Sequence, residues 1–196
     1  MDIDIKIIQK LRQETGAGML DCQKALQESK GDLEEAKRIL RKKGKKIANQ
    51  KENRETRAGL IEAYIHAGGK VGAMIELTCE TDFVARNEEF KNLAHDLAMQ
   101  VAATNPLYLT PEDIPEEVLE KEKEIIKDQL PDDKKKPEII DKIIQGKLDK
   151  YFSEVCLLKQ PFIKDDKLTI EDLIANKIAK IGENIKIKRF VRFSLS

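Results

Sequence analysis

Residues 79–90 read Cys-Glu-Thr-Asp-Phe-Val-Ala-Arg-Asn-Glu-Glu-Phe, and the predicted fold is organised around this stretch. An apolar run with strand character, residues 71–77, precedes it. A helix with a one-sided apolar stripe, from Phe90 to Ala102, follows it. Residues 81–86 are therefore expected in a strand-to-helix connection, a kind of segment that lies at the surface and commonly carries function.

The start of that helix is predicted at Asn87, whose side chain can cap the first turn. Glu88 and Glu89 then lie favourably at the positive end of the helix dipole. Phe83, just before the cap, has two interpretations. It either folds back as a hydrophobic staple for the helix start, or points outward as an anchor for a partner.

Three short helices are predicted within residues 1–41. The two glycines of Thr15-Gly16-Ala17-Gly18 break the first helix from the second. Gly31 ends the second helix and Asp32 can cap the third. Such a bundle is near the lower size limit for independent folding. Met19 beside the glycine turn is either a core residue or an adaptable contact surface.

The next segment, residues 42–57, is strongly basic and almost without apolar residues. We interpret it as a charged, extended or fraying linker. It also provides the strongest local argument for nucleic-acid contact, although basic runs without interleaved aromatic residues are usually solvated tethers. Its basic residues are Lys42, Lys43, Lys45, Lys46, Lys51, Arg54 and Arg57.

Residues 58–196 form the predicted larger domain. Residues 60–66 and 71–79 predict two strands joined by a glycine-containing turn at 67–70. Residues 107–155 predict two charged helices around a Pro131-Asp132-Asp133 loop, with isoleucine-rich stripes that either pack on the sheet or pair with a second copy.

The C-terminal part adds a helix and a strand. A near capping box at residues 169–172 starts the helix, and Gly182 can end it. The strand completes a three-stranded antiparallel sheet covered by helices, so the fold class is α+β. Strict alternation predicts one core face made of Ile185, Ile187, Val191, Phe193 and Leu195.

Composition excludes several classes of protein. The 36 basic and 36 acidic residues give a formal net charge of zero, which argues against a surface that is one phosphate-binding field. The three cysteines show no Cys-x-x-Cys spacing, so we expect neither a zinc site nor a disulfide framework. The residues show no catalytic triad, metal cluster or phosphate loop. We therefore expect that the protein is not an enzyme, uses no cofactor, has no membrane span and is located in the cytoplasm.

Four segments together resemble the elongation factor Ts family. They are LRQETGAGMLDCQKAL at 11–26, TDFVARNEEF at 81–90, LLKQPF at 157–162 and KIGENIKIKRF at 180–190, which agree with the family in type and order. The resemblance covers nearly the whole chain. It implies a ubiquitin-associated-like module at residues 1–41 and one core subdomain at 58–196, as in the short members, which form homodimers.

The same resemblance implies the partner and the contact residues. The family binds the GTPase elongation factor Tu and promotes GDP release by disrupting its Mg²⁺ and phosphate site. The residues implied in that disruption are Thr81, Asp82, Phe83, Val84 and Arg86. Those implied in docking of the N-terminal module are Arg12, Gly16, Ala17, Gly18, Met19 and Leu20.

Three functions are thus weighed. The first is a guanine-nucleotide exchange factor in translation, with no direct nucleic-acid contact. The second is an RNA- or ribosome-binding accessory protein that uses the basic linker at 42–57. The third is a structural dimer whose N-terminal module is only a tether. The residues alone do not choose among them, and the resemblance favours the first.

Overall fold

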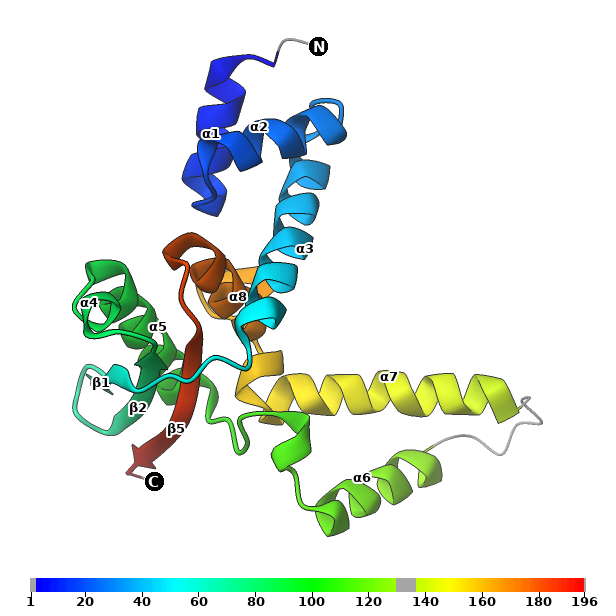
Figure 1. Ribbon diagram of the computed structural model, residues 1–196. Coiled ribbons are helices and arrows are strands. Elements are labelled where there is room, and N and C mark those ends of the chain that lie inside the picture. The colour runs from blue at the N-terminus through cyan, green and yellow to red at the C-terminus, as the bar shows by residue number, and fades with distance from the viewer. Residues whose placement is uncertain (1–2, 130–136, 196) are drawn as a thin grey trace.

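The structure, a computed structural model, describes residues 3–129 and 137–195. In Figure 1, the first two helices stand above a domain of mixed helix and sheet, the third runs down from them into that domain, and two helices, residues 116–128 and 137–155, project to one side. The elements are α1 (Ile5–Thr15), α2 (Met19–Glu28), α3 (Leu33–Lys51), β1 (Ala58–Ile65), β2 (Val71–Cys79), α4 (Asp82–Ala85), α5 (Glu88–Thr104), the short 3₁₀ helix η1 (Pro111–Asp113), α6 (Glu116–Asp128), α7 (Pro137–Val155), η2 (Leu157–Lys159), β3 (Pro161–Phe162), β4 (Asp165–Thr169), α8 (Ile170–Ile181) and β5 (Ile185–Ser194).

The three predicted N-terminal helices are present, but the third extends beyond residue 41, to Lys51. Gly16 ends α1 in the left-handed conformation at φ 69°, which glycine adopts without steric cost. Gly31, at φ 90°, follows α2. The Asp32 side chain accepts from two main-chain amides at the start of α3. The three helices enclose a small apolar core of their own, made of Ile8, Leu11, Cys22, Ala25, Leu26, Ala36 and Leu40.

The interpretation of residues 42–57 as an extended or fraying linker is wrong for most of its length. Helix α3 continues without a break to Lys51 and packs along α8. Gly44 lies at the crossing, where an added Cβ would be 2.9 Å from Asn176 Oδ1. The missing side chain therefore allows the two helices to approach closely, and this tertiary packing keeps a basic sequence helical.

The predicted three-stranded antiparallel sheet is also confirmed, in the order β1-β2-β5. Strand β1 pairs with β2 from Ala58 opposite Cys79 to Ile65 opposite Gly72. Helix α5, capped by Asn87 as expected, packs on the inner face of the sheet. The main core lies between this face, α5 and α8, and it includes Phe90, Leu93, Leu97, Val101, Ile75, Leu77, Ile170 and Ile178. The fold is α+β, as predicted.

Strand β5 contains a bulge that the alternation rule missed. Glu76 on β2 faces Arg189 and Leu77 faces Ile187, so Lys188 is an extra residue without a partner. Both basic side chains pair with Glu76: Arg189 Nε lies 2.6 Å and Lys188 Nζ 3.3 Å from its carboxylate oxygens. An extra residue reverses the side-chain alternation beyond it.

The predicted core face of β5 is therefore wrong after the bulge. Ile185 and Ile187 are buried as expected, whereas Val191 and Phe193 lie on the outer face and are 43% and 69% exposed. Leu195, just after the strand, is 72% exposed. Val191 and Phe193, with exposed residues of β1 and β2, form an apolar surface that we call the outer sheet patch. It is made of Ile61, Ile65, Met74, Val191 and Phe193.

Helices α6 and α7 form the predicted helical pair (Figure 1). The expected loop at Pro131-Asp132-Asp133 lies outside the described residues. Ile126 and Leu148 of the apolar stripes are buried, whereas Ile125 is 49% exposed and most other described residues of the stripes are partly buried. The predicted capping box at Thr169 is present and Gly182 ends α8 in the left-handed conformation. The short hairpin β3–β4 was not predicted.

Candidate functional site

The connection between β2 and α5 is a single helical turn, α4, and it carries an exposed aromatic side chain, Phe83. Phe83 is 88% exposed, the highest value among the exposed large apolar side chains of the described residues. The next residues turn inward, since Ala85 is buried and Val84 is partly buried against the main core. The staple interpretation of Phe83 is therefore wrong. The side chain points into solvent in the isolated chain.

Thr81, the residue just before α4, is held by an acid from the C-terminal part of the chain. Thr81 donates to the Glu183 carboxylate through its main-chain amide, at 3.0 Å, and through Oγ1, at 2.6 Å. The Cys79 thiol donates to the Thr81 carbonyl, at 3.3 Å. We call residues 81–86 the Phe83 turn. Its first residue is fixed from both sides, so the position of Phe83 depends on tertiary contacts.

The far end of the Phe83 turn leads directly into α5. The Asn87 side chain accepts from the Glu89 amide, at 2.8 Å, and so begins that helix. Glu89 pairs with Lys177 and Lys180 of α8. These cations, Lys180 above all, hold the pKa of the Glu89 carboxyl below its ordinary value. Within the described chain, neither Asp82 nor Arg86 shows a side-chain hydrogen bond or ion pair, and both are exposed.

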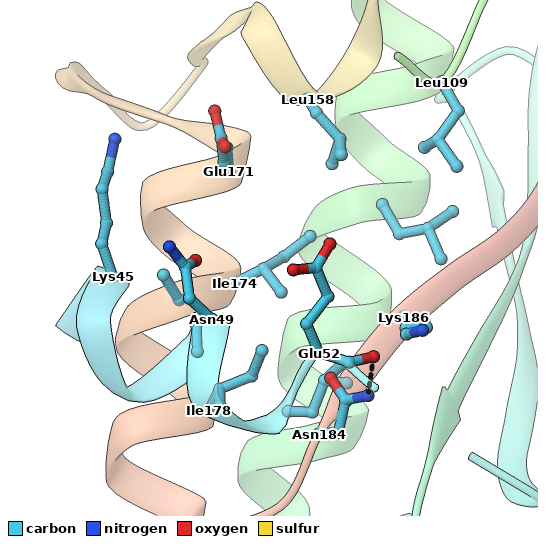
Figure 2. Close-up of a pocket in the computed structure, with 14 residues that line it drawn as sticks. Lys45, Asn49, Glu52, Leu109, Leu158, Glu171, Ile174, Ile178, Asn184 and Lys186 are labelled. Atoms are coloured by element: carbon cyan, nitrogen blue, oxygen red, sulfur yellow. Dashed lines mark hydrogen bonds between the residues drawn. The ribbon is translucent and has the colours of Figure 1, made fainter. Parts of the chain in front are cut away.

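Gly182 and Asn184, on either side of Glu183, are tied to the end of α3. Lys51 Nζ donates to the Gly182 carbonyl, at 2.7 Å. Asn184, only 2% exposed, donates from its side chain to the carbonyls of Glu52 and Arg54. Figure 2 draws the bond from the Asn184 side chain to the Glu52 carbonyl. Residues 182–184 thus join α3, α8, β5 and the Phe83 turn.

Beside this junction lies a pocket of about 360 Å³, between α3, α8 and β5 (Figure 2). Its wall is apolar, with Leu158, Ile174 and Ile178 among the lining residues. Lys45, Glu52, Glu171 and Lys186 supply both signs of charge around it. Because these charges balance, the lining does not select a ligand of one charge.

The N-terminal residues of the candidate surface are gathered at the turn between α1 and α2. Leu20 is 70% and Met19 39% exposed, although the other apolar residues of α2 are buried. Gly16 and Ala17 are partly buried, and Gly18 and Arg12 are exposed. The structure thus brings the six predicted residues to one corner of the module, with the contact interpretation of Met19 and Leu20 supported by their exposure.

Most basic residues of the segment predicted as a linker, residues 42–57, form ion pairs or hydrogen bonds within the chain. Lys43 pairs with Asp21, Lys45 with Asp172, Arg54 with Glu80, and Arg57 with Glu55. Lys51 binds the Gly182 carbonyl. These contacts help to hold α3 and the segment that follows it, whereas Lys42 and Lys46 are exposed.

The three cysteines are buried free thiols. Burial raises the pKa of the Cys79 and Cys156 thiols to about 11 and also raises the pKa of Cys22. No group of three or more potential metal ligands was found among residues 3–129 and 137–195. In the same residues, no helix has both the length and the apolar character needed to cross a membrane.

Sequence reasoning missed Glu183 as a residue of this site. It stands within the 180–190 segment, but its partner Thr81 is 102 positions away. A single sequence carries no sign of such a pairing. The available signal was the Thr169 to Gly182 helix prediction, which places Glu183 in the turn just before β5.

Comparison with known proteins finds one family over nearly the whole chain. The sequence model of a family described as "Elongation factor TS" matches residues 6–196. Proteins named elongation factor Ts are similar to this chain over nearly its whole length. That of Thermodesulfovibrio yellowstonii is 55% identical over 195 residues, covering 100% of this chain and 97% of the relative. That of Carboxydothermus hydrogenoformans is 52% identical over 193 residues, covering 98% and 89%. That of Thermotoga petrophila is 54% identical over 196 residues, covering 100% and 97%.

These matches show the class of protein to which the chain belongs: it is one of the elongation factors of protein synthesis. More narrowly, it belongs to the elongation factor Ts family.

Proposed function

We propose that this chain is a guanine-nucleotide exchange factor that binds elongation factor Tu and promotes the release of GDP. The observation that carries the proposal is Phe83, 88% exposed at the tip of a turn whose first residue is clamped by Glu183. A large aromatic side chain left in solvent on a supported turn fits an anchor that is buried only in a complex.

The mechanism follows from how a GTPase holds its nucleotide. GDP is bound through phosphate-loop amides and a Mg²⁺ ion that bridges to the phosphates. In the proposal, Phe83 enters the GTPase beside this site and displaces the groups that order Mg²⁺. Asp82, next to it and exposed, adds a negative charge near the displaced cation. The chain contributes binding energy and carries out no covalent step.

Nucleotide exchange then follows from the thermodynamic linkage between GDP binding and factor binding on the GTPase. If the factor weakens GDP binding by some ratio, GDP must weaken binding of the factor by the same ratio. A nucleotide from solution therefore re-forms the phosphate site and releases the factor. The exposed Met19 and Leu20 of the N-terminal module provide a second contact, and two linked contacts raise the effective concentration of each. Since elongation takes place on ribosomes, the proposed location is the cytoplasm.

We also propose that the protein is a homodimer formed through the outer sheet patch. Its five apolar side chains lie on adjacent strands, and a two-fold axis brings the same patch of two copies together. At its edge, Glu76 pairs with Lys188 and Arg189, so the acid of each face already has its partners within its own chain.

The experiment for the main proposal is release of fluorescently labelled GDP from purified elongation factor Tu. Adding this protein should accelerate release in proportion to its concentration, up to a limit. Adding the Phe83→Ala variant at the same concentration is the matched control. Equal release rates with and without the wild-type protein would defeat the proposal.

A further inference from the structure

We infer that Glu183 is a positioning residue that holds the Phe83 turn in the conformation the partner meets. The inference rests on the proposed function, because it concerns how Phe83 is presented. Glu183 lies in the connection between α8 and β5, residues 182–184, outside the Phe83 turn itself. It acts on Phe83 only through Thr81.

The contact geometry supports an ordering role. Thr81 is the N-cap residue of α4, yet its side chain makes no capping bond to that helix. Its hydroxyl and its amide both donate to the Glu183 carboxylate, one to each oxygen. Hydrogen bonds to an ionised carboxylate are stronger than bonds between neutral groups. The acid thus fixes the residue from which α4 starts, although it accepts from none of the amides of α4 itself.

The acid itself is held in place by its two neighbours. Gly182 is in the left-handed conformation and its carbonyl accepts from Lys51. Asn184 is buried, and its main-chain amide donates to the Glu80 carboxylate, at 2.7 Å. Glu183 therefore projects from a rigid junction between α3, α8 and β5.

Removal of this clamp has a specific consequence. A helix of four residues, α4, is too short to be stable by its own hydrogen bonds. Without Glu183, the turn samples other conformations and must be ordered when it binds, which weakens association. Phe83 itself is still present in the complex. We expect about a tenfold higher concentration for half-maximal GDP release, with the maximal rate within about twofold of wild type.

The first test is a kinetic comparison of Glu183→Ala, Glu183→Gln and Thr81→Ala, with the full-length protein in each case. Glu183→Gln keeps one acceptor oxygen and should lose less than Glu183→Ala. The Thr81→Ala and Glu183→Ala changes should be non-additive when combined, because the hydroxyl bond that Thr81→Ala removes is one of the two that Glu183→Ala removes. Glu171→Gln is the matched control: it removes a carboxylate of α8 that pairs with Lys159, away from the turn. A urea midpoint on each variant separates loss of order in the turn from loss of fold.

The second test needs no partner. The chain has no tryptophan, so Phe83→Trp places a single tryptophan on the turn, which can be excited selectively over the tyrosines. Its anisotropy decay should show a larger fast component when Glu183→Ala is added. An unchanged decay overturns the positioning role, whatever the release assay shows. If wild-type protein fails to accelerate GDP release but the decay changes, the proposed function is wrong and the positioning role of Glu183 stands.

Discussion

Lys45 on α3 and Asp172 on α8 form an ion pair, with 2.8 Å between Nζ and Oδ1, where the N-terminal module joins the larger domain. Asp172 is only 5% exposed, and Arg41 of α3 adds a second positive charge 4.0 Å from Oδ2. Burial raises the pKa of this carboxyl, but the hydrogen bond and charge of Lys45 outweigh burial, so the pKa lies below its ordinary value.

We predict that Asp172→Asn lowers the free energy of unfolding by about 1–3 kcal/mol at pH 7, because it removes one partner of a buried pair. The effect depends on pH with a definite sign. The folded-state pKa is depressed, so the stabilisation is full above the ordinary pKa near 4 and is lost as pH falls through the lower folded value. Urea midpoints at pH 7, 5 and 3 should show the gap between wild type and variant closing at low pH. A gap that widens on acidification would contradict this.

Phe83→Ala should abolish most of the stimulated GDP release. A hot-spot anchor contributes roughly 2–4 kcal/mol, equivalent to about a 30-fold or greater loss. Stability should change by less than about 1 kcal/mol, because the side chain is almost fully exposed in the free chain. A urea midpoint tests the expected stability of the variant, and a GDP-release rate tests the expected loss of stimulation. Near-normal release with this variant would remove Phe83 from the proposed mechanism.

Leu20→Asp should weaken binding to elongation factor Tu about tenfold without moving the urea midpoint, since Leu20 is exposed in the free chain and an acid would disrupt an apolar contact. A point change is preferred to deletion of residues 1–41, which would cut through α3. Leu107→Asp is the control, because Leu107 is 61% exposed but lies on the larger domain. Titration calorimetry with nucleotide-free elongation factor Tu gives both affinities. Equal affinities for the two variants would refute a contact by the N-terminal module.

The homodimer proposal predicts a doubled mass by light scattering at about 10–50 µM, a working range for moderate interfaces. Phe193→Asp should give a monomer, because it places a charge in the outer sheet patch. Ile125→Asp, at a 49% exposed position on α6, should leave the dimer intact. Dissociation by the α6 change alone would instead place the interface on the helical pair.

The three thiols should be inert in the native protein. With a pKa of about 11, Cys79 and Cys156 are thiolates in roughly one molecule per thousand at pH 8, and all three sulfurs are buried. A disulfide reagent should therefore modify almost none of them in minutes, and all three in urea. Rapid reaction of one thiol in the folded protein would show that its site opens more readily than the packing implies.

Local features were predictable because short-range interactions decide them. The side chains of Asp32 and Asn87 cap the helices expected of them, since each accepts from amides within three positions. Gly182 ends α8 because it adopts the left-handed conformation at little cost. The β1–β2 hairpin follows from two strand-like runs around glycines. The placement of Phe83 in a surface connection followed from the same local signals.

Long-range contacts decided the rest. The sequence of residues 42–51 is basic enough to be a solvated tether, and only packing on α8 at Gly44, with Asp172 facing Lys45, keeps it helical. One extra residue in β5, paired with Glu76 from a distant strand, reverses which side chains reach the core. Phe83 could be assigned to a connection from sequence, but Thr81, which starts its turn, is held by an acid 102 residues further along the chain. Caps and turns are set by neighbours along the chain, whereas these three features depend on which segments meet in space.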